Sequence, residues 1–289
     1  MAAIQYNNQA NKYQRFMDLN DEPLTIMTPI KGYDKMPLVS LEQAVRPLIS
    51  FIPEIEQMAD IAKRKCQRPP PDNLTLDQSA AIMLYTLEWE PKEQSVYYML
   101  NRALRTEDRQ ALKPWFLYLL SLRPSDKRTV FRGIKNDVSH RYKKGEKVIW
   151  WGFSSCTSKM DVLSNESFLG SQGQRTMFAI ECQSGKDIQK HSYFKGEHEI
   201  LLPAAREFDV EGVLPQGGNL CLIQLKEVRP KYPLIETPMI TQLVQKVPLN
   251  QPVQPISQQP IQSLSSKNYF HYTAPNTNYY RPSRLFFSI

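Results

Sequence analysis

The chain has 289 residues, of which 41% are hydrophobic and 22% are charged, a balance typical of a globular protein with a buried core. Its formal net charge is +7, but residues 237–289 hold four basic side chains and no acidic ones, which leaves +3 for residues 1–236. Since much of the positive charge belongs to the C-terminal region, we expect no nucleic-acid-binding face.

No apolar run approaches the roughly 20 residues that span a bilayer, and residues 1–16 lack the apolar stretch of a secretory signal. The four cysteines form no CxxC pair and are too few for a disulfide scaffold in a chain of this length. We therefore expect a reduced, cytoplasmic protein without a membrane segment, and an extracellular location stays open.

Residues 1–36 are polar and lack periodicity, whereas residues 37–122 are predicted to be helical. Two capping boxes each precede an apolar stripe of helical spacing: Ser40 with Gln43, and Thr75 with Gln78. Further helices are predicted near 95–104 and 112–122, and Pro53 is expected to interrupt the first element.

The hydrophobic period changes near residue 129, where short segments rich in β-branched and aromatic residues begin. Strands are predicted over 129–132, 147–153, 176–182, 187–189, 197–202, 208–213 and 220–228. Because helices come first and strands follow, the pattern favours an α+β fold with an antiparallel-rich sheet. Residues 230–289 are rich in Pro and Gln, then in Ser, Asn and Tyr, which predicts a disordered or extended tail that is a candidate for binding a protein partner.

Two motifs in the predicted sheet could bind a nucleotide. Residues 130–133 (VFRG) form an apolar strand ending in Arg132 and Gly133, where a guanidinium could fork two hydrogen bonds onto a phosphate and a glycine could admit a ligand to the backbone. Residues 150–158 (WWGFSSCTS) lead an aromatic strand into hydroxyl side chains that could bond a ribose or orient a carboxylate. Alone, the first motif is more typical of a strand that exits to solvent, and the second of a strand followed by a Ser/Thr-rich turn.

A third motif, residues 196–203 (GEHEILLP), places two acidic side chains before an apolar strand. Strand alternation predicts that Glu197 and Glu199 share one face, roughly 6–7 Å apart at a rise of about 3.3 Å per residue. Like charges on one face repel each other, so a cationic substrate is a natural partner. A solvated strand entrance is the alternative for an isolated pair.

The ordered trio of arginine, serine and paired glutamates resembles the R-S-E signature of the arginine-specific mono-ADP-ribosyltransferases, a family of animal ecto-enzymes and bacterial toxins. The helical segments and the final core strands are also similar, so the resemblance covers residues 37–229. It implies a catalytic domain with a helical part (37–122) and an ADP-ribosyltransferase-like β-sandwich core (129–229). The N-terminal segment 1–36 and the tail 230–289 lie outside this domain.

The resemblance also implies roles for individual residues. Arg132, next to Gly133, corresponds to the arginine that anchors the NAD phosphates and ribose. Ser155 corresponds to the first residue of the family's Ser-Thr-Ser element, here Ser-Cys-Thr, which positions the nicotinamide ribose and the catalytic glutamate. Glu199 corresponds to that catalytic glutamate, and Glu197 to the residue that engages the acceptor guanidinium.

Two loops complete the expected site. Phe168 lies in segment 161–170, where the family has its loop over phosphate and nicotinamide. Tyr193 and Phe194 lie in segment 190–196, which resembles the loop that contacts the protein substrate. The predicted substrates are NAD, with NADP left open, and a protein with an exposed arginine, and no metal is expected.

A placed carboxylate can stabilise the oxocarbenium charge that develops on the ribose when nicotinamide leaves. A second carboxylate can hold an acceptor arginine and take its proton, which explains the use of two glutamates. Poly-ADP-ribose polymerases have histidine in the first site, so Arg132 argues against them. An NAD glycohydrolase on the same fold and a catalytically inactive interaction module are the remaining alternatives.

Overall fold

The structure is a computed structural model that describes residues 18–235 except 24, 33–38, 90, 107–126 and 167. The described residues belong to one compact unit, Met1–Lys246. The helix predicted near 112–122 and the tail beyond residue 235 therefore lie outside the described residues.

Short helices occupy the N-terminal half of the described chain. They are α1 (Leu41–Val45), α2 (Ile55–Lys65), α3 (Leu76–Thr86) and α4 (Val96–Leu104), with 3-10 turns η2 (Asp18–Asp21), η3 (Arg46–Leu48) and η4 (Lys92–Gln94). Both predicted capping boxes are confirmed: Ser40 Oγ accepts the Gln43 N–H at 3.3 Å, and Thr75 Oγ1 accepts the Gln78 N–H at 3.2 Å. Among the described residues, no helix has the length and apolar character needed to cross a bilayer.

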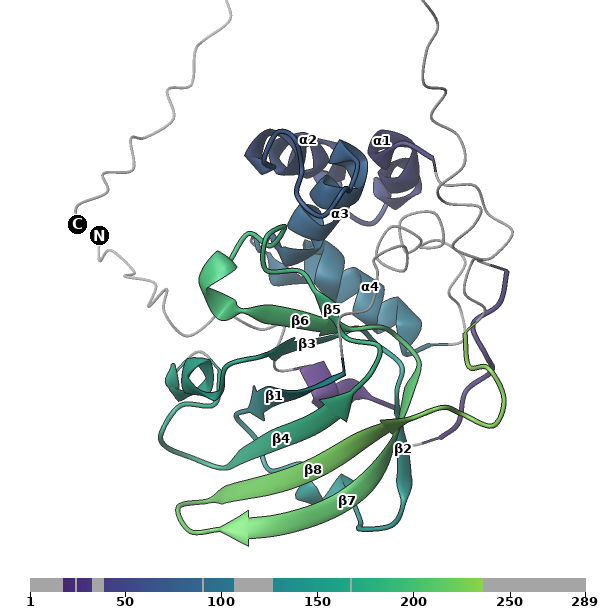
Figure 1. Cartoon of the computed structure of the whole chain (residues 1–289). Helices are drawn as coiled ribbons and strands as arrows, with labels where there is room; N and C mark the ends of the chain where they lie inside the picture. Colours follow the sequence, from purple (N-terminus) through teal and green to yellow (C-terminus); the bar gives the residue numbers. More distant parts are fainter. Residues whose placement is uncertain are drawn as a thin grey trace, which may run out of the picture. The chain divides into compact units, whose positions relative to one another are not determined.

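The C-terminal half forms an eight-stranded sheet (Figure 1). Its strands are β1 (Arg128–Ile134), β2 (Lys147–Trp150), β3 (Ser154–Thr157), β4 (Arg175–Cys182), β5 (Lys186–Asp187), β6 (Glu199–Leu202), β7 (Arg206–Gln216) and β8 (Leu220–Val228). The spatial order is β2-β7-β8-β4-β1-β3-β6-β5, in which β4 and β8 are parallel and the other pairs are antiparallel. The predicted α+β class, with helices first and an antiparallel-rich sheet afterwards, is confirmed.

The sheet curls so that the edge strand β2 shares a core with β4 and β6. Trp150 on the edge strand β2 makes an edge-on contact with Phe178 on β4, at 5.4 Å between ring centroids, although β7 and β8 separate these strands in the sheet. Ile200 and Leu202 of β6 join this core, while Leu201, on the opposite face, joins a second core with the helices. Strand β6 is thus buried on both faces, which accounts for its uninterrupted apolar sequence.

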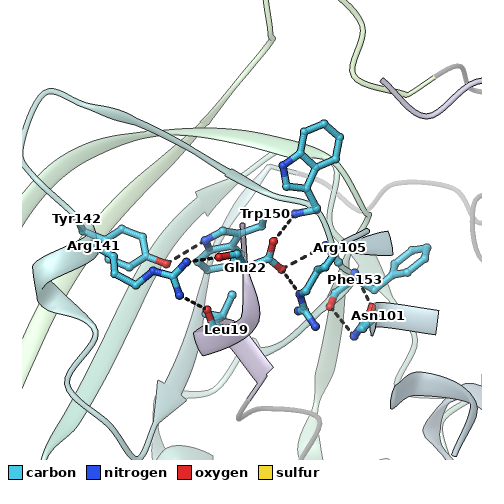
Figure 2. A network of polar contacts seen from close by, with 10 residues as sticks. Leu19, Glu22, Asn101, Arg105, Arg141, Tyr142, Trp150 and Phe153 are labelled. Carbon is cyan, nitrogen blue, oxygen red and sulfur yellow. Dashed lines mark hydrogen bonds and ion pairs between the residues drawn. The ribbon is translucent and has the colours of Figure 1, made fainter. Parts of the chain in front are cut away.

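The strand predicted over 147–153 ends at Trp150 as β2, and a strand that was not predicted, β3, begins at Ser154. The two strands pair with different neighbours. The chain turns between them because the N–H groups of Trp151 and Gly152 donate to the carboxylate of Glu22, at 2.7 and 3.2 Å, and not to a strand partner. The same carboxylate accepts from Arg105 Nε at 2.8 Å (Figure 2). An acidic side chain near the N-terminus therefore shapes the turn that leads into β3.

Figure 2 also shows hydrogen bonds from helix α4 and from Arg141 next to the Glu22 carboxylate. Asn101 on α4 exchanges two hydrogen bonds with the backbone of Phe153, at 2.9 and 3.1 Å. The guanidinium of Arg141 donates to the carbonyl oxygens of Leu19 and Glu22. Helix α4 and the N-terminal segment thus fix the chain immediately before Ser154 and Ser155.

Candidate active site

The three motifs found in the sequence lie on three neighbouring strands. Arg132 is on β1, Ser155 on β3 and Glu199 on β6, and β3 pairs with both of the others. Each of the three residues is at most 1% exposed. The fold therefore brings together polar residues that are up to 67 positions apart in the sequence.

Arg132 does not stand at a strand end, as the sequence suggested, because β1 continues to Ile134. Its guanidinium is fully buried, and Nη1 donates to the carbonyl oxygen of Ser155 at 2.7 Å. The hydroxyl of Ser155 is also buried and has no hydrogen-bond partner among the described residues. Because buried polar atoms are nearly always bonded, this hydroxyl is suited to bind a polar group of a ligand.

Glu199 opens β6 directly opposite Thr157 of β3. The prediction that Glu197 shares this strand was wrong, since Glu197 ends the 3-10 turn η8 (Lys195–Glu197) and β6 begins at Glu199. The residue between them, His198, has a left-handed backbone (φ 49°, ψ 47°), which breaks the alternation of an extended strand.

Both glutamates are nevertheless buried beside β3. Glu197 is 6% exposed, and its carbonyl oxygen accepts from Thr157 Oγ1 at 2.9 Å. The carbonyl oxygen of His198 accepts from the N–H of Ser158 at 3.2 Å. Residues 157 and 158 therefore hold the turn that separates the two carboxylates.

The loop 190–196 presents an aromatic pair next to this turn. Tyr193 is 42% exposed, and its ring packs edge-on against Phe194 at 4.9 Å between centroids. The ammonium group of Lys65, at the end of α2, lies 5.1 Å from the centroid of Tyr193. Tyr193 is thus the exposed member of the pair beside the turn that ends at Glu197.

Phe168 follows the 3-10 turn η7 (Met160–Ser164) and is 2% exposed. With Leu163 and Leu169 it forms a small cluster against Phe131 of β1. A Cβ atom on Gly133 would lie only 2.7 Å from Leu169 Cβ, so glycine is required for this approach. Leu163, Phe168 and Leu169 thus pack on β1 next to Arg132.

Sequence reasoning missed one polar neighbour of the site, Ser192. Its hydroxyl is fully buried and donates to Glu199 Oε2 at 3.2 Å. The available signal was a hydroxyl residue beside Tyr193 and Phe194 in the loop already singled out. Only the folded chain shows that this loop returns to Glu199.

The middle residue of the Ser-Cys-Thr element faces the core. Burial raises the pKa of Cys156 to about 12, although the nearby Arg132 opposes this shift. Cys156 is therefore a neutral thiol and not a nucleophile. The described His, Cys, Asp and Glu side chains form no group of three that could hold a metal ion.

A curled, mostly antiparallel sheet with helices before it, and with Arg132, Ser155 and Glu199 on adjacent strands, defines an ADP-ribosyltransferase-type domain. The sequence matches the family described as NAD:arginine ADP-ribosyltransferase over residues 53–231. Because this match covers more than half of the chain, the protein belongs to that family, and membership supports NAD-dependent transfer of ADP-ribose.

Individual proteins are similar to this chain in sequence or in fold. A protein of Mycobacterium avium (strain 104) named NAD(+)--arginine ADP-ribosyltransferase Mav is 29% identical over 150 residues, which make up 50% of this chain and 17% of that protein. The fold is similar to the crystal structure of the eucaryotic mono-ADP-ribosyltransferase ART2.2, with a TM-score of 0.50, 22% identity and coverage of 66% of this chain and 85% of that one. A variant of ART2.2 in complex with NAD gives a TM-score of 0.51, 20% identity and coverage of 66% and 86%.

Proposed function

We propose that this protein transfers ADP-ribose from NAD to arginine side chains of a protein acceptor and releases nicotinamide. The observation that carries the proposal is the placement of two buried carboxylates on separate pieces of backbone, Glu199 on β6 and Glu197 on the turn before it. One carboxylate can stabilise the breaking of the bond to nicotinamide, while the other can bind the guanidino group that attacks the ribose. The family match to arginine-specific enzymes supports the choice of acceptor.

In the first half of the reaction, the bond between nicotinamide nitrogen and ribose C1′ breaks, and its electron pair stays on nicotinamide. The pyridinium becomes a neutral leaving group, so no acid is needed, and positive charge develops on the ribose. Glu199 would stabilise this charge, with Ser192 holding one of its carboxylate oxygens. The hydroxyl of Ser155 would bond the nicotinamide ribose, and Arg132 would attract the phosphates.

In the second half, a guanidino nitrogen of the acceptor attacks C1′ and loses a proton. Free arginine is protonated at neutral pH, so a carboxylate is needed to hold it and to take the proton as the new bond forms. Glu197 ends the turn that follows Tyr193 and Phe194, and this position supports its assignment to the acceptor.

The test is transfer of label from ADP-ribose-labelled NAD to a small guanidino compound, measured together with nicotinamide release. Glu199→Gln should reduce both signals by about 100-fold or more, because it removes the charge that stabilises the transition state. Glu197→Gln should reduce labelling to a similar extent while it retains most nicotinamide release. Glu211→Gln, an exposed residue on β7, is the matched control and should leave both unchanged.

Nicotinamide release by the wild-type protein without labelling of any guanidino acceptor would overturn the arginine assignment and favour NAD hydrolysis. An equal loss of both signals in Glu197→Gln would remove the separate acceptor role of that residue.

A further inference from the structure

A buried histidine links the loop 190–196 to the helical part of the fold. The ring of His191 is 2% exposed, and its Nδ1 lies 2.9 Å from Ser79 Oγ on α3. Its Nε2 lies 3.3 Å from Oδ2 of Asp72, which precedes α3. The histidine is thus held from both sides by residues that come more than 100 positions earlier in the chain.

The protonation state of this ring follows from its surroundings. Burial lowers the pKa of His191 below its usual value, with a contribution from Lys190, while Asp72 and Asp187 act in the opposite direction. The ring is therefore neutral near pH 7, and the nitrogen facing the Asp72 carboxylate must donate. The other nitrogen then accepts from the Ser79 hydroxyl.

The three residue types are those of a hydrolytic triad, but the geometry excludes that function. Ser79 is 2% exposed and lies within α3, so no substrate can reach its hydroxyl. The acidic member is the half-exposed one, with 45% of its side chain accessible. Instead, the hydrogen bonds of His191 to Ser79 and Asp72 attach the loop to the helical part of the fold.

The two residues after His191 extend this connection in opposite directions. Ser192 Oγ donates to Glu199 Oε2 at 3.2 Å and accepts from the N–H of Phe194 at 3.2 Å. The N–H of Tyr193 donates to Thr86 Oγ1, the last residue of α3, at 2.8 Å. Consecutive residues of the loop therefore contact α3 and Glu199 alternately.

We propose that His191 is a positioning residue, which fixes the loop 190–196 on α3 so that Glu197 and Tyr193 meet the acceptor arginine while Ser192 keeps Glu199 aligned. This inference rests on the proposed arginine transfer and adds a determinant outside the R-S-E residues. Glu199 is also held by its strand pairing with Thr157, whereas Thr157 holds Glu197 through its carbonyl oxygen, in the turn at the end of the loop. Loss of the hydrogen bonds made by His191 should therefore reduce transfer to the acceptor more than NAD cleavage.

The experiment compares His191→Ala with His191→Gln and with His140→Ala, a control at an exposed histidine on η6 (Ser139–Arg141). For His191→Ala we expect labelling of a guanidino acceptor to fall about tenfold or more, because small displacements of a reacting group are costly. Nicotinamide release should fall less than about threefold, and the KM for the acceptor should rise while the KM for NAD stays near its wild-type value. His191→Gln, whose amide can still donate to Asp72, should recover part of the transfer, and His140→Ala should match the wild type.

A second measurement is independent of activity. Hydrogen–deuterium exchange in His191→Ala should become faster at residues 191–197 and stay unchanged in β1 and β4. A proportional loss of transfer and nicotinamide release, with unaltered exchange in the loop, would overturn the proposal. A wild-type protein that cleaves NAD but labels no guanidino acceptor would reject the proposed function, and the exchange comparison would still decide whether His191 holds the loop.

Discussion

Glu22 and Arg105 lie 83 positions apart in the sequence and form a buried ion pair, with 4% and 5% of their side chains exposed. The carboxylate of Glu22 also accepts the two N–H groups that turn the chain from β2 toward β3 (Figure 2). Arg105 follows α4, so the pair joins the N-terminal segment, the helical part and the strand that carries Ser155. The carboxylate of Glu22 thus holds these three parts of the chain together.

Removal of this carboxylate should be strongly destabilising, because it takes away a buried acceptor of the Arg105 guanidinium and of the Trp151 and Gly152 N–H groups. We expect Glu22→Ala to lower the free energy of unfolding by about 3–5 kcal/mol. Asp60→Ala, which breaks the exposed pair with Arg64 on α2, should cost less than about 0.5 kcal/mol. Urea denaturation followed by tryptophan fluorescence measures both, and equal costs would contradict the structural role of Glu22.

Gly133→Ala should disturb the segment 160–170, because the added methyl group would lie 2.7 Å from Leu169 Cβ and 3.2 Å from its backbone. If that segment contacts NAD, as the family resemblance implies, the KM for NAD should rise about tenfold. Gly212→Ala is the matched control, since a Cβ there has no neighbour within 4 Å. Steady-state rates of nicotinamide release give the KM for NAD of both variants. An unchanged KM in Gly133→Ala would argue against a role of the segment in NAD binding.

Because of Lys186 on β5, the free energy of unfolding should vary with pH in the alkaline range. Burial, and secondarily the nearby Arg206, lower the pKa of Lys186 from 10.5 to about 8 in the folded protein. Between these values the unfolded chain binds more protons than the folded one, so stability rises with pH, and the cost of burying the charge is fully present below about pH 8. The full change amounts to about 3 kcal/mol.

Lys186→Met removes this titration. Its stability advantage over the wild type should be largest at pH 7 and should shrink at pH 10, as measured by urea denaturation at both values. Groups that titrate elsewhere cancel in this difference, so a constant advantage across the range would contradict the lowered pKa of Lys186.

The thiols should be unreactive in the folded protein. All four cysteines are buried, and burial raises the pKa of each, most clearly that of Cys156. Because the thiolate is the reactive form, timed alkylation read by mass spectrometry should proceed at least about 100-fold more slowly than in urea. Cys156 should be the last to react, and rapid modification of it in the native protein would show that the core around β3 opens.

Features encoded by nearby residues were predictable from the sequence. The capping boxes at Ser40 and Thr75 depend on contacts three residues apart, and the apolar run of β6 reports its burial directly. The order of Arg132, Ser155 and Glu199 was also visible, because each stands in a distinct local motif. Their adjacency in space follows only from the strand order.

Other features depend on contacts that no local pattern encodes. The strand predicted over 147–153 ends at Trp150, because the N–H groups of Trp151 and Gly152 donate to the distant carboxylate of Glu22. The turn at Glu197 depends on a left-handed backbone at His198, which only a minority of non-glycine residues adopt. Ser192 gains its importance from a loop that folds back onto Glu199.

The left-handed residue His198 has a consequence for how such enzymes can diversify. In the proposed reaction it stands between the carboxylate that serves the leaving group and the carboxylate that serves the nucleophile. Changes in the turn upstream of His198 could therefore select a different nucleophile, while the sheet downstream continues to break the same glycosidic bond. In the proposed reaction, a single residue, His198, would thus separate the part of the backbone that serves bond breaking from the part that serves acceptor choice.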